Sequence, residues 1–171
     1  MNKMRELRIE KITLNIGVGS PGDKLNNAKK LLQTITGLKP VETSSIKRIP
    51  TWGVRPKLPI ACKVTVRGKK AEEILQRLLM SRENKLPARK IDAFGNFSFG
   101  IEEYITIPGV KYDATIGVIG LEVAVTLTRP GYRIKNRSLQ KKKIPTRHQI
   151  KREDVVSYLK EKFSVNIEEA E

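Results

Sequence analysis

The chain has 171 residues, with 34 Lys and Arg against 18 Asp and Glu, which gives a formal net charge of +16 at pH 7. Its length fits one domain, or one domain with an appended tail. A charge this large predicts a polyanionic partner, for which nucleic acid is the first candidate and an anionic membrane surface the competitor. Because no apolar run approaches the roughly 20 residues of a spanning helix, and the first residues lack the apolar core of a signal peptide, we expect a cytoplasmic protein with no membrane partner.

The first half of the chain alternates between strand and helix patterns. Across residues 7–17, apolar and polar side chains alternate as in a strand buried on one face. Ser20 is a candidate N-cap, with Pro21 in the first turn, for a helix that ends at Gly37. A short strand is expected over residues 40–45.

The second half predicts three more strands and a second helix. Residues 60–66 alternate as a strand that ends at Gly68, and residues 71–79 show helical spacing of apolar side chains. Strands are expected at 97–101 and 121–127, with a loop-like segment between them. The order predicts an α+β sheet with helices packed on one face.

The C-terminal part is a strongly basic extension. Residues 129–152 hold ten Lys or Arg and no acid, with Pro and Gly as breakers. We expect this segment to form no core of its own and to order on a partner. A last helix is predicted at about residues 151–163. The sequence thus divides into a domain of residues 1–128 and a basic C-terminal extension with a terminal helix, residues 129–171.

The scarcity of Cys and His limits the possible chemistry. Cys62 is the single cysteine and His148 the single histidine, which excludes an internal disulfide and a thiolate zinc cluster. Cys62 stands at an apolar strand position and His148 within the basic extension, and neither has a visible partner for nucleophilic catalysis. We expect a protein that is not an enzyme and that uses no metal or cofactor.

Polar residues share one face of two predicted strands. If the apolar residues of the 60–66 strand face the core, Lys63, Thr65 and Arg67 share the opposite face, and by the same rule Thr13 and Asn15 share the outer face of the first strand. Should these strands be neighbours, the open face would offer amide, hydroxyl and cationic groups to phosphates and 2′-hydroxyls. The alternative is an ordinary solvent-facing sheet.

A long basic loop joins the strands at 40–45 and 60–66. It contains the only tryptophan, and a loop of this length between strands is usually functional or disordered. An exposed indole among cations suits stacking on an unpaired base, whereas the alternative places the tryptophan in the core. The candidate RNA-binding residues of the loop are Lys47, Arg48, Thr51, Trp52, Gly53, Arg55 and Lys57.

A G-x-G-x-x-G pattern at residues 17–22 suggests a competing function. It follows a strand and precedes a helix, with Glu42 in the next strand, where dinucleotide-binding enzymes carry a ribose-binding acid. However, Pro21 occupies the turn that would cradle pyrophosphate, and no second crossover helix follows Glu42. The glycines then serve as turn residues, with the helix start as a phosphate contact.

Four segments resemble a known family. KITLNIGVG (residues 11–19), ITGLKPVET (35–43), LPIACKVTVRG (58–68) and FGNFSFGIEEYITIPGVKYD (94–113) resemble, in this order, the large-subunit ribosomal protein family that binds 5S rRNA, the fifth in that subunit's naming series. The likeness spans about residues 7–128. It implies an antiparallel sheet that grips 5S rRNA, a long loop that reaches P-site tRNA, and a place in the large ribosomal subunit that helps anchor the central protuberance.

The resemblance also assigns individual positions. The family's RNA-contacting asparagine and threonine fall on Asn15 and Thr65, and the aromatic and arginine of its loop fall on Trp52 and Arg55. A family glutamine is replaced by Leu38, which puts that contact in doubt. The remaining residue of the expected rRNA-binding set is Lys39, which keeps its charge.

Further partners follow from the same resemblance. Residues 107–119 would contact a small-subunit protein across the subunit bridge, and neighbouring large-subunit proteins are expected around the chain. The basic extension departs from the bacterial pattern and resembles the archaeal form. Its charge predicts contacts with large-subunit rRNA through Arg133, Lys135, Arg137, Lys141, Lys142 and Lys143. The alternatives are the dinucleotide-binding enzyme and a non-specific cationic nucleic-acid-binding protein.

Overall fold

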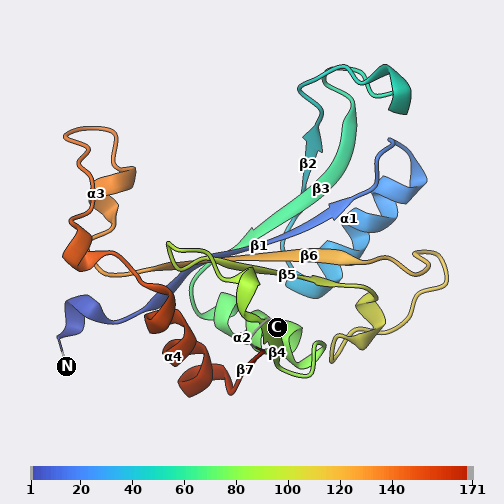
Figure 1. Cartoon of the computed structure of the whole chain (residues 1–171). Coiled ribbons are helices and arrows are strands. Elements are labelled where there is room, and N and C mark those ends of the chain that lie inside the picture. The colour runs from blue at the N-terminus through green and yellow to red at the C-terminus, as the bar shows by residue number, and fades with distance from the viewer. Residues whose placement is uncertain (1, 169–171) are drawn as a thin grey trace.

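The central strand β1 (Arg8–Gly17) organises the fold, which a computed structural model describes for residues 2–168. It pairs antiparallel with β3 (Pro59–Val66) on one side and β6 (Leu121–Thr128) on the other. Two edge strands, β2 (Val41–Ser44) and β5 (Phe97–Ile101), complete an antiparallel sheet in the order β2-β3-β1-β6-β5 (Figure 1). The predicted strands are therefore confirmed, with shifts of at most one residue at their ends.

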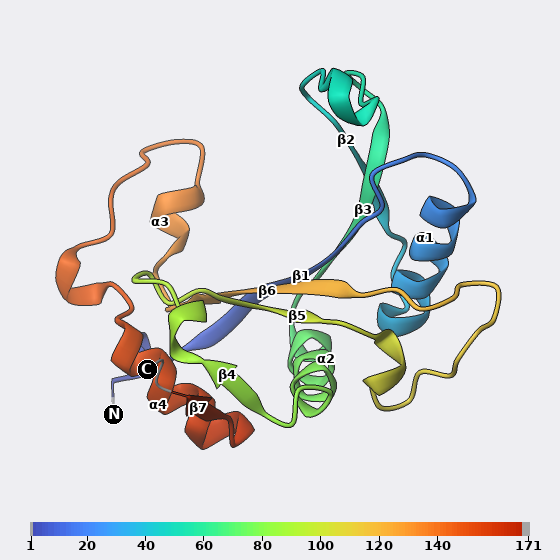
Figure 2. The same cartoon turned by 45° about the vertical axis from the view of Figure 1, so that its right-hand side comes forward.

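One face of this sheet is covered by two helices, α1 (Asp23–Thr36) and α2 (Lys69–Met80). Alternate residues of β1, such as Ile12 and Leu14, are fully buried, and they belong to the same apolar cluster as Leu32 of α1 and Leu75 of α2. Figure 2 shows α2 below the strands and α1 to the right of β3, and the alternate residues of β1 and β3 that point away from these helices are exposed or half-buried, so the opposite face of the sheet is open. The structure confirms the α+β class with helices on one face.

The start of α1 differs from the sequence prediction. The N-cap is Gly22, without a side-chain cap, and not Ser20. Pairing with β3 continues past the end of β1, because the amides of Val18 and Gly19 both donate to the Ile60 carbonyl, at 2.9 and 2.8 Å. The helix can begin only after this extra stretch of pairing and the bend that follows it. Its end is as predicted, at Gly37 in the left-handed region with φ of 66°.

The C-terminal extension joins the core of the main domain. Helix α4 (Arg152–Phe163) contributes Val155 and Leu159, which are fully buried in the same cluster as the sheet. Ile150 approaches the turn at Gly95 so closely that a Cβ there would lie 2.5 Å from its Cγ2. Gly95 also has φ of 86°, so the turn needs glycine on two grounds.

Two features of this half were not predicted. A short parallel pair joins β4 (Lys85–Pro87) to β7 (Asn166–Glu168), and a single-turn helix, α3 (Arg133–Asn136), lies in the basic extension (Figure 1). Both are too short to produce a periodic pattern, and β4 and β7 are far apart in sequence. Among the described helices, none is long and apolar enough to cross a membrane.

Candidate nucleic-acid interface

The open face of the sheet brings together four of the predicted RNA-binding residues. In the register of β1 and β3, Thr13 is opposite Thr65 and Asn15 is opposite Lys63. All four side chains are exposed or half-buried, whereas their neighbours along each strand are buried. The condition set by the sequence, that these two strands be neighbours, is therefore met.

Acidic residues border this open face. Asn15 donates from Nδ2 to the Glu122 carboxylate of β6 at 3.4 Å, and the Arg67 guanidinium lies 3.8 Å from Glu10 of β1. The face is thus a mixed hydrogen-bonding surface and not a uniform cationic patch. A surface of this kind favours contacts of defined geometry over general attraction to phosphates.

Leu38 and Lys39, in the connection between α1 and β2, behave differently from each other. Lys39 is exposed after the end of α1. Leu38, where the resembled family has a glutamine, is half-buried and packs against the apolar core. Leu38 thus has a packing role. Its apolar side chain cannot replace the hydrogen bonds of the family's glutamine.

The long loop between β2 and β3 carries its seven candidate residues on its surface. Lys47, Arg48, Arg55 and Lys57 are all exposed, and the Trp52 side chain is 76% exposed. The alternative that placed this tryptophan in the core is therefore wrong. Thr51 and Gly53, at the tip, are exposed as well.

The loop is nevertheless ordered by its own contacts. Ile49 and Val54 exchange both backbone hydrogen bonds, at 2.9 and 3.1 Å, and Val54 is buried beneath the tip. Gly53 adopts φ of 65° and donates its amide to Pro50 at 3.0 Å, which closes a 3-10 turn under Trp52. The indole is consequently presented on a preformed turn, which lowers the entropic cost of stacking on a base.

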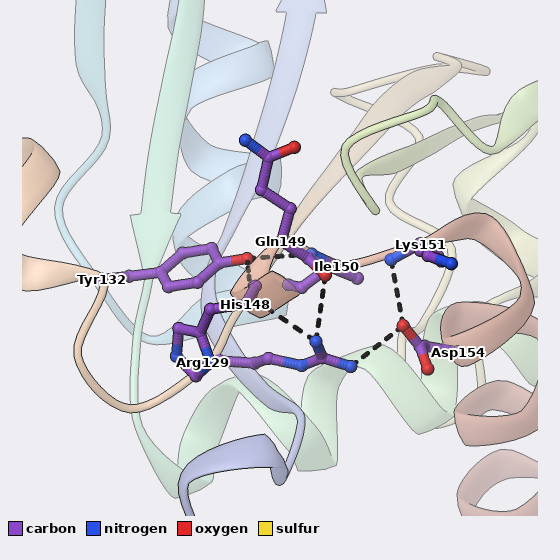
Figure 3. A network of polar contacts seen from close by, with 7 residues as sticks. All are labelled: Arg129, Tyr132, His148, Gln149, Ile150, Lys151 and Asp154. Atoms are coloured by element: carbon purple, nitrogen blue, oxygen red, sulfur yellow. Dashed lines mark hydrogen bonds and ion pairs between the residues drawn. The ribbon is translucent and has the colours of Figure 1, made fainter. Parts of the chain in front are cut away.

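A polar network closes the base of the basic extension (Figure 3). Arg129, whose side chain is only 8% exposed, donates to the carbonyl of Gln149 at 2.9 Å and forms an ion pair with Asp154 at 2.9 Å. The Tyr132 hydroxyl donates to the His148 carbonyl at 3.1 Å and accepts from the amide of Ile150 at 2.9 Å. Residues 130 and 149 are thus held near each other at the foot of one loop.

This network corrects the expectation that the extension orders only on a partner. No side chain between residues 130 and 149 is buried, as expected for a segment without a core of its own. Its two ends, however, are fixed on the main domain by Arg129 and by Asp154, which also accepts from the Lys151 amide at the start of α4. The sequence showed the charges but not these contacts, which join residues about 20 positions apart.

The side chains in this network have structural roles. The ring Nε2 of His148 lies 2.8 Å from the Pro130 carbonyl, and since a carbonyl only accepts, Nε2 carries the donated proton. Burial raises the pKa of the Tyr132 hydroxyl, so this group stays protonated at neutral pH and can keep donating to His148. Burial likewise raises the pKa of Cys62, which keeps that thiol in its unreactive form.

Most of the basic residues of the extension that we predict to bind rRNA are exposed to solvent. Arg133, Lys135 and the run of Lys141, Lys142 and Lys143 are exposed. Arg137 is partly committed inside the loop, because its guanidinium donates twice to the Gln140 carbonyl, at 2.9 and 2.5 Å.

A cavity of about 590 Å³ lies between this loop and the sheet, and no sequence pattern indicated it. Its walls come from the ends of β1 and β6, the turn at residues 94–96, α3, residues 141–144 and residues 149–150. These segments lie up to 140 positions apart in the chain, so no local pattern could reveal it.

The dinucleotide-binding alternative does not agree with the fold. That function requires a parallel, doubly wound sheet, whereas β1 is antiparallel to both of its neighbours. Glu42, the candidate ribose-binding acid, forms an ion pair with Lys29 of α1. Within residues 2–168, no group of three or more His, Cys, Asp or Glu side chains could hold a metal ion.

Two family models together match most of the chain. The model described as "Ribosomal protein L5" matches residues 2–55, and a second model, described as the C-terminus of the same ribosomal family, matches residues 59–151. The chain belongs to the ribosomal protein L5 family.

Similar proteins come from archaea, in agreement with the resemblance of the extension to the archaeal form. "Large ribosomal subunit protein uL5" of Methanosphaera stadtmanae is 49% identical over 168 residues, which cover 98% of this chain and 100% of that protein. Proteins of the same name from Sulfurisphaera tokodaii and Nanoarchaeum equitans are each 48% identical, and cover 99% and 96% of this chain and 96% and 97% of their own length. Membership of a family of ribosomal proteins confirms that the chain is not an enzyme.

The network at the base of the extension should contribute measurably to stability. Replacing Arg129 by Met removes the ion pair with Asp154 and two carbonyl contacts, and we expect a loss of about 1.5–3 kcal/mol in the free energy of unfolding, measured by urea denaturation. Arg8→Met, which breaks only an exposed pair with Glu6, is the matched control and should change stability little. Equal stability of the two variants would show that the network does not hold the extension.

Proposed function

We propose that the chain is a structural component of the large ribosomal subunit that binds 5S rRNA and helps anchor the central protuberance. The observation that carries this proposal is the row of paired polar residues on the open face, Thr13 with Thr65 and Asn15 with Lys63. Hydroxyl and amide groups at fixed spacing suit the 2′-hydroxyls and phosphates of a folded RNA. Lys39 and Arg67 extend this rRNA-binding surface at its borders. In this function the protein acts in the cytoplasm as part of the ribosome.

The long loop is proposed to contact both 5S rRNA and P-site tRNA. It extends from the edge of the sheet formed by β2 and β3, on the side opposite to α2 and α4 (Figure 1). Its ordered tip presents an exposed indole and four cations, which can stack on a base and neutralise phosphates at the same time.

The extension and the acidic segment between β5 and β6 are proposed to face different partners. The exposed cations of residues 133–143 suit large-subunit rRNA, through sequence-independent phosphate contacts. Residues 107–119 lie in a region with Glu102, Glu103 and Asp113 and with the exposed apolar side chains of Tyr112 and Val118. This composition suits a basic protein, and we propose the small-subunit protein of the subunit bridge. Neighbouring large-subunit proteins complete the set of partners.

Binding to 5S rRNA beside a duplex RNA of equal length, repeated across a salt series, tests the proposal directly. We expect a preference for 5S rRNA that persists at high salt, because hydrogen bonds of defined geometry are less screened than phosphate contacts. Equal and steeply salt-sensitive binding to both RNAs would instead favour a non-specific cationic nucleic-acid-binding protein.

The loop tip should contribute to RNA binding without contributing to stability. The double change Trp52→Ala with Arg55→Ala should weaken 5S rRNA binding by about tenfold or more, since one base–aromatic stack is worth about 1–3 kcal/mol. The thermal unfolding midpoint should stay nearly unchanged because both side chains are exposed. Val118→Ala, an exposed apolar residue far from the loop in sequence, is the control. Unchanged binding of the double variant would exclude the loop from the interface.

The open face can be tested by a change that keeps the shape of the side chain. Thr65→Val replaces a hydroxyl by a methyl group and should cost about 1 kcal/mol of 5S rRNA affinity for the lost hydrogen bond. Thr34→Val, at an exposed position of α1 on the helical side of the sheet, provides the control. If filter-binding titrations give the two variants the same affinity, the RNA lies elsewhere.

A further inference from the structure

The cavity beneath the basic loop combines groups that neither the sheet face nor the long loop brings together. Its wall includes Lys11 of β1 and, from the extension, Lys135 and the lysine run of residues 141–143. None of these lysines forms an ion pair within residues 2–168, and Glu10, beside Arg67, is the one acid in the wall. The cavity is therefore strongly cationic. Its volume of about 590 Å³ is of the size that binds small organic molecules, roughly 300–1,000 Å³.

Two groups in the wall, the ring of Phe94 and the side-chain amide of Asn136, remain accessible to a ligand. The Phe94 side chain is 69% exposed although it lines the cavity. The Asn136 side chain is exposed and makes no hydrogen bond to any residue that the structure describes. By contrast, Asn96 and Gln149, also in the wall, already donate to Asp92 and to the Ile144 carbonyl.

We propose that this cavity receives one unpaired nucleotide of an RNA. Its base stacks on Phe94, the edge of the base meets the amide of Asn136, and its phosphate lies among Lys141, Lys142 and Lys143. An aromatic face, an amide and clustered cations are the groups by which proteins bind single unstacked nucleotides. This inference rests on the proposed RNA-binding function and adds to it a site for one extruded nucleotide.

The wall is built to keep its shape before RNA arrives. Asp92 accepts the amides of Phe94 and Asn96, at 2.9 and 2.7 Å, which fixes the turn that carries the aromatic ring. On the other side, the backbone of Gln149 is held by Arg129 while its side chain points away from that network (Figure 3). The contact of Gly95 with Ile150 joins the two sides. A preformed wall reduces the conformational cost of capturing a nucleotide.

The test compares two RNA hairpins of equal length, one with a single bulged nucleotide and one fully paired. Each of the four bases is placed in the bulge in turn, and binding of the full chain is followed by fluorescence anisotropy. We expect at least one bulged hairpin to bind about tenfold more tightly than the paired one, the value of a single stacked base. Phe94→Ala should abolish this difference and leave the thermal midpoint unchanged.

Three further variants separate the parts of the site. Asn136→Ala should reduce the preference among the four bases, whereas Lys142→Gln should weaken binding to both hairpins and lower the salt dependence by about one counterion. Leu139→Ala, 80% exposed on the same loop but outside the cavity wall, is the matched control and should change nothing.

Two outcomes would overturn the inference. The first is equal affinity of the wild-type chain for bulged and paired hairpins, or a preference for the bulge that survives Phe94→Ala. The second is displacement of the bulged hairpin by AMP at similar concentration, which would assign the cavity to a free nucleotide. Neither outcome touches the preference for 5S rRNA at high salt, so failure of this site and failure of the proposed function are distinguishable.

Discussion

The alternation of side chains along β1 is the constraint on which the rest of the molecule depends. Because β1 pairs with both β3 and β6, a shift of one residue would turn Ile12 and Leu14 outward and bury Thr13 and Asn15. The same period of two that places apolar groups against α1 and α2 thus fixes the polar groups of the open face. The hydrophobic core and the open polar face are two sides of one register, so the polar groups that we propose to bind RNA are positioned by the packing of the core.

Much of the positive charge that folding leaves unpaired lies on segments that project from the sheet. Folding neutralises few of the basic side chains, and many of those that remain lie on two projecting segments, the loop between β2 and β3 and the loop of residues 130–149. Projection separates the two sets of cations from each other and reduces their mutual repulsion. The acids are used differently: Glu122 and Glu10 border the open face, and Asp154 holds Arg129. An RNA partner would therefore relieve repulsion that the isolated chain retains.

Periodicity alone was enough to predict the strands β1, β3, β5 and β6 and the helices α1, α2 and α4, because each buries one regular face. The polar faces of β1 and β3 followed from the same alternation, whereas the pairing of these strands was left open by the sequence. The exposure of Trp52 was predicted from its place in a long loop between strands. The failures have physical causes. The start of α1 depends on the bonds from Val18 and Gly19 to Ile60, and the anchoring of the extension depends on Arg129 meeting Asp154. Such contacts between distant residues leave no local pattern, and for the same reason the cavity was missed.

The closed base of the extension has a consequence for how the chain responds to proteolysis. The run of Lys141, Lys142 and Lys143 is exposed, and is the kind of site that trypsin-like proteases cut. Yet the segments before and after it are both fixed, through Arg129 after β6 and through α4 in the core. A cut there would break the covalent chain without freeing either piece. The nicked protein would stay folded and migrate as a single species under native conditions. The cut in the loop would become visible only after denaturation.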